Sequence, residues 1–454
     1  MADKLLFSVA GARGIVGRTI DADVVTRLTA AFCAVLPEGP LVLGRDTRPS
    51  GRAFALSAAG AITASGRDCI DVGVAATPTV EMVTDRSEAV GGVIVTASHN
   101  PVEWNALKLL DHRGIFIDAA LGERVLAAYE SGLFAFADGR STGHVRAYEG
   151  ASAEHVEAIL GLDVIDVERI RSRRFKVVLD CINGAGSVIA PHLLERLGAQ
   201  VVEMDCEPSG DFHRDPEPRP ENLQALAARV RAEGADVGFA CDPDADRLAL
   251  VDETGRALSE EYTLALAADE VLAARRGPVV VNLSTSSLID VVADRHGVVL
   301  HRTPVGEAHV VARMLETGAV VGGEGNGGVI LPALHPGRDA VLGMALILQI
   351  LAAREQSLSR QVEQYPPFYM TKNKVALEGP FSTERVREAL GALRPIEVDT
   401  QDGVKAVLRE GWIHLRVSNT EGLVRVIAEA PDGDRARALA EEGRRLLHSS
   451  WGKG

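Results

Sequence analysis

Short runs of apolar residues alternate with amphipathic segments over the first 365 residues of the chain. One order of elements occurs three times: an apolar run, a polar loop, an amphipathic segment, a glycine turn and a second apolar run. Uninterrupted apolar runs indicate strands covered on both faces, and strands that alternate with helices predict βαβ units in a mainly parallel sheet. The three occurrences begin at GPLVLGRDTRPSG (39–51), RFKVVLDCINGAG (174–186) and GPVVVNLSTSS (277–287).

The pattern changes after Pro366, where short apolar strands follow one another between two helical segments. This order is typical of a smaller α+β domain with an antiparallel sheet. The predicted fold class is therefore α/β, with three similar α/β domains built on mainly parallel mixed sheets and a C-terminal α+β domain. We predict domains at residues 1–150, 151–255, 256–365 and 366–454.

Composition restricts the partners of the protein. The 454 residues carry a formal net charge of −15 and 4% aromatic residues, which argues against nucleic acid as a partner. No apolar run approaches the length of a membrane span, and the N-terminal segment lacks the core of a signal peptide, so we expect a cytoplasmic protein without membrane contact. The cysteines are isolated and form no CxxC pair, which indicates free thiols in a reducing compartment.

The segment CDPDADRLALVDETG (241–255) carries the strongest chemical signal. Asp242, Asp244 and Asp246 alternate directly after an apolar run, and in extended backbone this spacing turns the three carboxylates to one face. Three converging carboxylates repel one another unless a hard cation binds them, and Mg²⁺ prefers oxygen ligands. We therefore predict a Mg²⁺ site. A solvated acidic turn explains poorly why these acids lie between two apolar strands.

A second candidate lies in GGVIVTASHNPVEWNALK (91–108), where an apolar run stops just before Ser98 and His99. Ser98 could be an acyl-transfer nucleophile, a phosphate acceptor or an ordinary residue of a turn that precedes proline. A serine and a histidine adjacent in sequence rarely cooperate in acyl transfer, and no G-x-S-x-G elbow occurs in the chain. Lys108 could return a basic side chain to the same pocket.

Two further clusters suit a sugar and a phosphate. VVGGEGNGGVILP (320–332) surrounds Glu324 with glycines, so the backbone can approach a ligand closely and the carboxylate can accept hydrogen bonds from sugar hydroxyls. RVSNTEGLVR (416–425) crowds arginines and hydroxyls into one turn, which is a common way to hold a dianionic phosphate. The plainer alternatives are a glycine turn between strands and a polar turn with surface arginines.

Weaker candidates lie in other loops, several of which follow predicted strands, where α/β domains bind ligands. In GRDTRPSG (44–51), Asp46 lies between two arginines and suggests a structural ion pair. The remaining candidates are Arg13 in GARGIVG (11–17), Thr303 and Gly306 in HRTPVGE (301–307), and His335 and Arg338 in HPGRDA (335–340).

Taken in order, these segments resemble the motifs of the α-D-phosphohexomutase family, which includes phosphoglucomutase, phosphomannomutase and phosphoglucosamine mutase. TASHNP, DPDADR, GEGNG and RVSNTEGLVR occur in the family's order, together with GRDTRPSG and PSGDFHRDPEPRPENL. The match covers essentially the whole chain. The resemblance implies four domains around a central cleft, and an enzyme that interconverts the 6-phosphate and 1-phosphate of a hexose or hexosamine.

The resemblance also implies roles for the candidate residues. Ser98 would be a phosphoserine that transfers its phosphoryl group through a bisphosphorylated sugar intermediate, with Mg²⁺ held by this phosphate and the three aspartates. Arg247 would steady the phosphoryl group, and Lys108 would act in proton transfer. Arg13 would correspond to the family's first-domain arginine, and His99 would shape the loop or neighbour the phosphate. The sugar would contact Glu324, Gly325, Asn326 and Gly327, and the second phosphate would contact Arg416, Ser418, Asn419, Thr420 and Arg425.

Departures from the family pattern bear on proton transfer and on the substrate. Many members have GE-x-S-G-H where this chain has EGNGG, so the family's histidine is Gly328 and His335 is the candidate to replace it. The EGNGG loop followed by GRDA is similar to archaeal-type phosphoglucosamine mutases, so we expect glucosamine phosphate as substrate. Mannose and glucose phosphates are the alternatives. Alternatives of another class are a Ser98-dependent phosphatase and a non-catalytic sugar-phosphate-binding protein, and we expect a monomer or homodimer.

Overall fold

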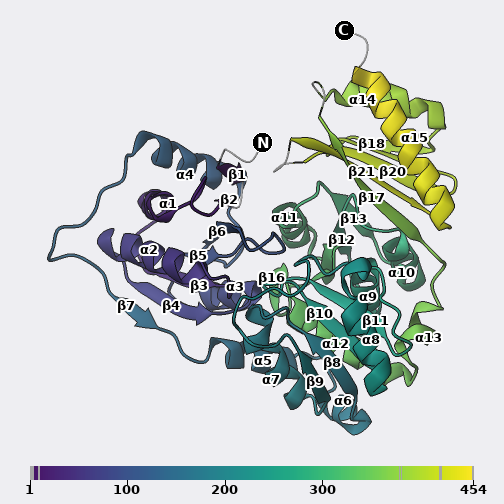
Figure 1. Ribbon diagram of the computed structural model, residues 1–454, viewed down its shortest axis with the longest axis horizontal. Coiled ribbons are helices and arrows are strands. Elements are labelled where there is room, and N and C mark those ends of the chain that lie inside the picture. Colours follow the sequence, from purple (N-terminus) through teal and green to yellow (C-terminus); the bar gives the residue numbers. More distant parts are fainter. Residues whose placement is uncertain (1–4, 9–10, 378, 380, 419–421, 452–454) are drawn as a thin grey trace.

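The computed structural model describes residues 5–8, 11–377, 379, 381–418 and 422–451. Within these residues the strands form four sheets, and helices pack beside each sheet (Figure 1). We call the four units domains I to IV in chain order. Domain I, in purple to blue, and domain IV, in yellow, lie on opposite sides of the molecule, with domains II and III between them.

Domain I contains the first predicted strand–helix–strand unit. β3 (Leu41–Arg45) leads through α2 (Gly51–Ala64) to β4 (Cys69–Val74), which runs parallel to β3. β5 (Gly91–Val95) is also parallel to β3, whereas β6 (Trp104–Asp111) folds back antiparallel to β5, so the TASHNP loop is the turn of a hairpin. The sheet order is β1-β2-β6-β5-β3-β4-β7, and the other elements are β1 (Leu6–Ser8), β2 (Gly11–Ile15), β7 (Val145–Ala147), α1 (Ala22–Val35), α3 (Thr77–Arg86) and α4 (Ala119–Ser131).

Domain II contains the second predicted unit, in which β8 (Lys176–Asp180) and β9 (Gln200–Met204) are parallel neighbours. β10 (Val237–Cys241) is parallel to β8, and β11 (Leu248–Asp252) turns back antiparallel to β10. The predicted metal loop is the turn of this hairpin. The sheet order is β11-β10-β8-β9, and the helices are α5 (Ala151–Leu160), α6 (Val167–Arg173), α7 (Ala190–Arg196) and α8 (Gln224–Glu233).

Domain III contains the third predicted unit, in which β12 (Val279–Asn282) is parallel to β13 (Leu300–Thr303) and to β14 (Val321–Glu324). β15 (Gly328–Leu331) and β16 (His335–Arg338) add two antiparallel strands, so the glycine cluster forms the β14–β15 turn. In each of the first three sheets the parallel pairs include the predicted units, and antiparallel hairpin strands are added beside them. The helices are α9 (Glu261–Ala274), α10 (Leu288–His296), α11 (Glu307–Thr317), α12 (Ala340–Arg354) and α13 (Leu358–Val362).

Domain IV is an antiparallel sheet in the order β17-β21-β20-β19-β18, which confirms the predicted change of pattern. Its helices α14 and α15 pack together beside the sheet (Figure 1). The short strand β18 is an addition to the predicted elements. The bounds are β17 (Tyr369–Ala376), α14 (Thr383–Leu390), β18 (Glu397–Asp399), β19 (Val404–Leu408), β20 (Gly411–Val417), β21 (Leu423–Ala430) and α15 (Gly433–Trp451).

The helix α12 explains why domains II and III keep a fixed relation. Apart from Gln349 and Arg354, its 15 residues are apolar or glycine and cover all sides of the helix, which packs against α6 and α7 of domain II as well as α9 and β15 of domain III. A helix without a polar stripe is stable only where it is covered all round. The largest hydrophobic cluster of the described residues accordingly contains buried side chains of both domains.

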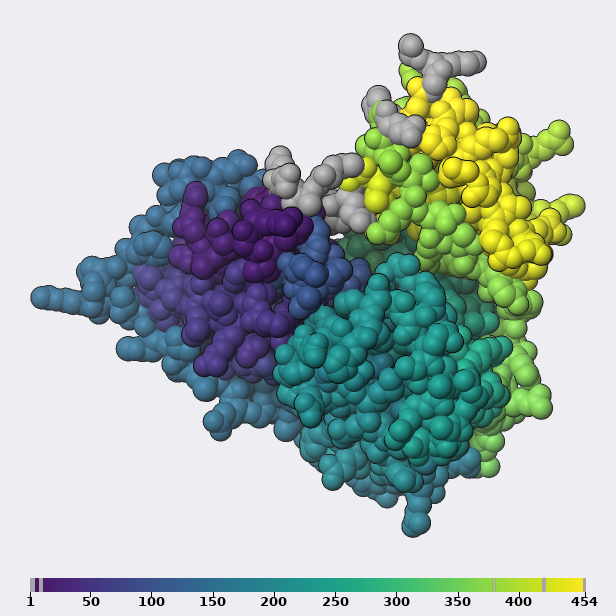
Figure 2. Space-filling model, viewed as in Figure 1, coloured from purple at the N-terminus to yellow at the C-terminus, as the bar shows by residue number. Residues whose placement is uncertain are grey.

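The molecular surface is hollowed between domains I and IV. Figure 2 shows these two domains standing on either side of a recess whose floor belongs to the teal and green middle of the chain. None of the described helices is both long enough and apolar enough to cross a membrane.

Candidate active site

The Ser98 loop is held by a buried arginine. The Arg48 guanidinium donates to the backbone oxygens of Ser98, Asn100, Pro101 and Trp104, the last two at 2.7 and 3.1 Å. Its Nε binds a carboxylate oxygen at 3.0 Å, so the predicted ion pair in GRDTRPSG is confirmed as a fully buried structural pair with Asp46. Four carbonyls fixed by one planar guanidinium leave the loop little freedom.

Ser98 itself has left-handed backbone with φ of 50° and lies almost fully buried. Its N–H donates to Thr96 Oγ1 at 3.0 Å. Its hydroxyl donates to Oδ2 of Asp242 at 2.8 Å, although 144 residues separate the two in sequence. A non-glycine residue with positive φ is uncommon and at a functional site often serves to aim a side chain. Domain I thus points the candidate nucleophile at the candidate metal loop of domain II.

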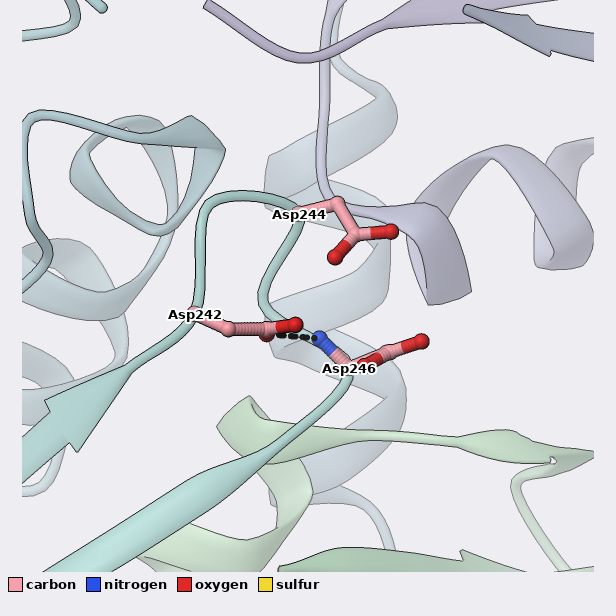
Figure 3. Close-up of side chains that lie close together, drawn as sticks. All are labelled: Asp242, Asp244 and Asp246. Atoms are coloured by element: carbon pink, nitrogen blue, oxygen red, sulfur yellow. Dashed lines mark hydrogen bonds between the residues drawn. The ribbon is translucent and has the colours of Figure 1, made fainter. Parts of the chain in front are cut away.

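The three predicted metal ligands converge at the β10–β11 turn (Figure 3). One oxygen from each of Asp242, Asp244 and Asp246 lies within 4.8 Å of the others, and all three side chains are buried. The backbone N–H groups of Asp246 and Arg247 each donate to Oδ1 of Asp242 at 3.2 Å, which closes the turn. The sequence motif therefore folds into a compact carboxylate cluster.

The carboxylate cluster fits a divalent cation. Among the described residues, Oδ1 of Asp244 and Oδ1 of Asp246 are buried and accept no hydrogen bond. A buried carboxylate oxygen without a donor is costly unless a cation neutralises it. Burial, together with the charges of Asp246 and Asp244, raises the pKa of Asp242 well above its usual range. An all-oxygen set of this kind suits Mg²⁺.

Lys108 brings a positive charge to the same cluster from β6. Its Nζ lies 2.7 Å from Oδ2 of Asp244 and 3.6 Å from Oδ2 of Asp246. Thr77, at the start of α3, donates its hydroxyl to the same oxygen of Asp244 at 2.8 Å. Burial alone would raise the pKa of Asp244, but Lys108 lowers it below its usual range.

His99 is a neutral imidazole beside Ser98. Its Nδ1 lies 3.2 Å from the Ser98 hydroxyl oxygen. Burial, followed by the guanidinium groups of Arg247 and Arg13, holds the pKa of His99 well below its usual range. Arg13 also donates to the side chain of Asn100 at 3.1 Å, so this arginine from β2 contacts the Ser98 loop. Two arginines therefore flank the loop in which a serine-bound phosphate would lie.

Arg247 lies beside the carboxylate cluster. Its Nε is 3.7 Å from Oδ1 of Asp246, and its Nη1 is 3.8 Å from Oε1 of Glu217. The Nε atom is buried and donates no hydrogen bond among the described residues. A donor held in this way can bind an additional acceptor such as a phosphoryl oxygen.

The glycine cluster of domain III holds Glu324 in a network of donors. Asn282 donates to Oε1 of Glu324 at 2.8 Å, and the N–H of Gly306 donates to the same oxygen at 3.1 Å. Asn326 lies 3.4 Å from the other oxygen. The glycines are required by space: a Cβ on Gly325 would lie 1.9 Å from Oε2 of Glu261. Gly327 has left-handed backbone with φ of +91°. In the neighbouring loop, the Thr303 hydroxyl donates to the backbone oxygen of Pro304.

The predicted phosphate loop lies on β20 and β21 of domain IV. Arg416 and Arg425 are directly opposite each other on the two strands, and Lys374 of β17 is opposite Arg425. Asp402 accepts from Nε of Arg416 at 2.7 Å and from the N–H of Val305 in domain III at 3.0 Å. The N–H of Ser418 closes the turn on Leu423, and the predicted residues Asn419 and Thr420 lie outside the described residues.

This row of three cations follows from strand pairing. A dianionic phosphate would be attracted to this row, because arginine and lysine side chains form charge-assisted hydrogen bonds with phosphate oxygens. Lys374 was not predicted from the sequence. A single lysine in a strand is unremarkable, and its place beside the arginines becomes clear only when β17 pairs with β21.

Comparison with known proteins places the whole chain in one family. Models described as phosphoglucomutase/phosphomannomutase alpha/beta/alpha domains I, II and III match residues 4–135, 153–255 and 259–369. The model of the C-terminal domain of the same family matches residues 374–446. The chain belongs to the phosphoglucomutase/phosphomannomutase family. It is thus a phosphosugar mutase, an isomerase, as the sequence motifs predicted.

Relatives of this mutase carry different substrate names. A Thermococcus kodakarensis protein named phosphoglucomutase/phosphomannomutase is 38% identical and covers 98% of this chain and 99% of its own length. A Methanopyrus kandleri protein named probable phosphoglucosamine mutase is 35% identical over 96% of each chain. The crystal structure of a family protein from Burkholderia thailandensis has a TM-score of 0.85 and 27% identity and covers 98% of both chains.

In this mutase, Arg338 forms ion pairs with carboxylates of domains II and III. This buried side chain donates to Asp246 at 2.6 Å, to Glu324 at 2.7 Å and through Nε to Glu307 at 3.1 Å. A Cβ on Gly328 would lie 2.3 Å from Cδ of Arg338. The arginine stem therefore occupies the space that a side chain at position 328 would need, which accounts for the glycine at the family's histidine position.

His335 lies at the interface between domains I and III in this mutase. Its Nε2 is 3.1 Å from the backbone oxygen of Gly114 and 3.8 Å from Oε2 of Glu81. Burial lowers the pKa of His335 to about 4. The contacts described for this imidazole are thus with domain I residues other than the predicted site residues, whereas Arg338 on the same strand reaches the carboxylate cluster.

Proposed function

We propose that this phosphosugar mutase interconverts the 6-phosphate and 1-phosphate of a hexosamine or hexose with Ser98 as the phosphoryl carrier. The observation that carries the proposal is the 2.8 Å hydrogen bond from the Ser98 hydroxyl to Asp242. A serine that points at a buried carboxylate cluster is unsuited to acyl transfer, because the negative charge of the carboxylates would destabilise the oxyanion intermediate. Phosphoryl transfer with a cation between serine phosphate and carboxylates accounts for both groups.

Mg²⁺ would be held by Asp242, Asp244 and Asp246 together with a phosphoryl oxygen on Ser98. When bound, Mg²⁺ supplies positive charge that polarises the phosphoryl group and orients it. The orphaned oxygens of Asp244 and Asp246 support this assignment. Arg247 and Arg13 add fixed positive charge on the side of His99.

Lys108 is the residue to which we assign proton transfer. Its ammonium group can donate a proton to the oxygen that leaves phosphorus and can recover it from the attacking hydroxyl in the reverse direction. The 2.7 Å contact with Asp244 orients it. His99 is neutral and adjacent to Ser98, which suits a hydrogen-bonding role more than that of a cation.

The cation row of domain IV would bind the phosphate that is not being transferred. Phosphoryl transfer from phosphoserine to a sugar monophosphate gives a bisphosphorylated sugar, and the return of the other phosphate to Ser98 requires the sugar to turn over. Arg416, Arg425 and Lys374 would bind the phosphate through its charge. Such a site would accept the bisphosphorylated sugar in either orientation. Glu324 of domain III would accept hydrogen bonds from the sugar hydroxyls.

Glucosamine phosphate is our proposed substrate, because the EGNGG and GRDA loops are similar to archaeal-type phosphoglucosamine mutases and the Methanopyrus kandleri relative carries that name. Glucose and mannose phosphates are the second candidate, which the more similar Thermococcus kodakarensis relative favours. Both candidates use the same carrier, metal and phosphate grip, so they differ only in which sugar hydroxyls or amine the cleft accepts.

The test is a panel of glucosamine, glucose and mannose 1-phosphates assayed for formation of the 6-phosphate, with the parent protein and Ser98→Ala. We expect turnover by the parent, a phosphoryl mass increment on Ser98, and loss of nearly all activity in Ser98→Ala with the fold retained. Parent-like turnover by Ser98→Ala would exclude the carrier role. Release of inorganic phosphate without isomerisation would indicate a phosphatase, and binding without turnover would indicate a non-catalytic homologue.

A further inference from the structure

Three cysteine thiols lie together in domain II, close to the metal loop. Cys181 follows β8, Cys206 follows β9 and Cys241 ends β10, so all three lie at the carboxyl ends of neighbouring parallel strands. The side chain of Cys206 reaches β8, because its Sγ lies 3.4 Å from the backbone oxygen of Leu179, two residues before Cys181. A Cβ on Gly186 would lie 3.3 Å from Sγ of Cys181 and 3.5 Å from Sγ of Cys241, which places both sulfurs on one face of the sheet.

The three thiols differ in exposure and in proton affinity. Cys181 and Cys241 are fully buried, whereas Cys206 is only partly buried. A hydrogen bond from Cys181 lowers the pKa of the Cys206 thiol below its usual value. The same contact and burial raise the pKa of Cys181, which therefore keeps its proton. Partial exposure and a lowered pKa both favour oxidation of Cys206 over that of the buried thiols beside it.

The two thiols of domain I provide a contrast within the same chain. Cys33 and Cys69 are both buried, and burial raises their pKa values to about 11 and about 12. Thiols of this kind react slowly with oxidants, because the thiolate is the reactive form. The five cysteines thus fall into an inert pair and a group with one reactive member.

Backbone strain accompanies the thiol group. Ile182 and Asn183, directly after Cys181, have φ of 50° and 54°, and Asp205, directly before Cys206, has φ of 48°. Left-handed backbone at a β-branched residue such as Ile182 is rare and costs energy. The N–H of Asn183 donates to the oxygen of Asp205 at 2.5 Å, so the two cysteine segments are already tied side by side. A bond between their thiols needs no large movement.

The segment that begins at Cys206 leads to the Ser98 loop. We call residues 206–214 the strap. Within it, the ring of Phe212 lies 5.1 Å from Cζ of Arg48, the side chain that holds the Ser98 loop. Arg214 ends the strap by donating to Asp180 and to the backbone oxygen of Cys241, both at 2.8 Å. The strap therefore contacts both the support of Ser98 and the strand that enters the metal loop.

We propose that Cys206 is a site of reversible oxidation by hydroperoxides, with Cys181 as the resolving thiol, and that the resulting disulfide inhibits the enzyme by displacing the strap. The Cys206 thiolate attacks a peroxide oxygen; the S–O bond forms, the O–O bond breaks, and hydroxide leaves and takes up a proton. The sulfur of Cys181 then attacks the sulfur of Cys206, and water leaves with the Cys181 proton. The two thiols lose two electrons in total, and hydrogen peroxide becomes two waters.

The experiment treats the reduced full-length protein with hydrogen peroxide, blocks the remaining thiols and maps disulfides by peptide mass spectrometry. We expect a peptide pair joining Cys181 and Cys206, with Cys33 and Cys69 unmodified. Mutase activity should fall by at least about tenfold, because small displacements of a catalytic loop have large effects, and dithiothreitol should restore it. Hydrogen exchange should show faster opening of residues 206–214 in the oxidised protein.

The control variants are Cys206→Ser and Cys69→Ser. Before treatment both should have the activity of the parent, and after treatment only Cys206→Ser should keep it. In Cys181→Ala a sulfenic acid on Cys206 should accumulate and react with dimedone. Absence of the Cys181–Cys206 peptide pair from the oxidised parent, or its replacement by a pair that contains Cys241, overturns the proposal. So does equal inactivation of the parent and Cys206→Ser. Disulfide mapping is independent of the sugar substrate.

Discussion

Lys108 and Asp244 come from different domains, and their side chains form a buried ion pair with Nζ 2.7 Å from Oδ2. Burial alone would lower the pKa of Lys108, but Asp244 and Asp246 raise it above its usual value. The pair joins the strand that follows the Ser98 loop to the metal loop of domain II. The position of the Ser98 loop is thereby coupled to that of the carboxylate cluster.

Replacement of Lys108 by glutamine should reduce kcat by roughly 10²- to 10³-fold, because a positioned acid and a charge beside the phosphoryl group are both lost. Lys108→Arg keeps the charge and should retain more activity than Lys108→Gln. Steady-state kinetics with the best substrate of the panel measure the effect, and circular dichroism checks the fold. An unchanged kcat in Lys108→Gln would remove this lysine from the mechanism.

Removal of divalent cations should lower the melting temperature as well as the activity. Without a cation the three buried carboxylates repel one another, and at about 100 times its Kd a ligand stabilises the folded state by about 2.7 kcal/mol. Thermal melts in a chelator and in excess MgCl₂ measure this difference. Asp246→Asn should lose most of the shift, whereas Asp434→Asn, an exposed carboxylate on α15, should keep it. Identical melts with and without Mg²⁺ would contradict the metal assignment.

Replacement of Arg338 by methionine should destabilise the protein by about 3–5 kcal/mol, because three buried carboxylates lose their counter-charge. These are Asp246, Glu307 and Glu324. Urea unfolding followed by fluorescence measures the loss. Arg313→Met removes an exposed pair with Glu316 and should change stability by less than about 1 kcal/mol. Similar losses in the two variants would mean that the Arg338 network contributes little.

Lys374→Met should raise KM by about tenfold with a smaller effect on kcat, because one charge-assisted contact to the non-transferring phosphate disappears. The prediction rests on the cross-strand position of Lys374 opposite Arg425. Arg435→Met is the matched control, since this arginine of domain IV pairs with Glu410 away from the row. Equal KM values in the parent and Lys374→Met would restrict the phosphate grip to the arginines.

Acid should weaken the contact between domains III and IV through His414. Its two ring nitrogens lie 2.9 Å from the Ser284 hydroxyl and 2.6 Å from the backbone oxygen of Asp402, and burial lowers its pKa to about 4. In the unfolded chain histidine titrates near about 6.5, so unfolding takes up a proton between these values. The free energy of unfolding should therefore fall by about 3 kcal/mol as pH drops through this window.

The measurement is the free energy of unfolding of the parent and of His414→Gln at several pH values between 4 and 7. The groups that face the imidazole, Lys405 and Arg416 together with Asp402, are unchanged in this variant. His414→Gln should lose less stability on acidification than the parent. His144→Gln, at an exposed position, should behave as the parent does. Equal pH dependence in the parent and His414→Gln would show that another group controls acid sensitivity.

Much of the fold was predictable from local pattern. The three strand–helix–strand units and the antiparallel C-terminal domain follow from the apolar runs and their spacing. A strand covered on both faces and an amphipathic helix each have a hydrophobic periodicity that depends only on residues nearby in sequence. The antiparallel hairpins that complete the first three sheets were harder to predict from the sequence. β16 contains His335 and Arg338, and two of its four residues carry ionisable side chains that strand pairing buries.

The candidate site divides in the same way. Asp242, Asp244 and Asp246 could be identified because they are close together in sequence. The expected extended backbone was wrong, since the three carboxylates converge in a hairpin turn with left-handed backbone at Ala245. Arg338 was assigned to the substrate from its loop, yet its contacts are with carboxylates 14 to 92 residues away. Lys374 was missed, because nothing near it in sequence is unusual.

Sequence alone therefore determined the residue types, the order of the elements and the local cluster of acids, since these depend on neighbours within one turn or one strand. Tertiary structure alone decided that Ser98 points at Asp242, that Lys108 reaches Asp244 and that Arg338 fills the space beside Gly328. The physical reason is that these contacts cross domain boundaries, where burial and electrostatic pairing select partners that no local periodicity connects.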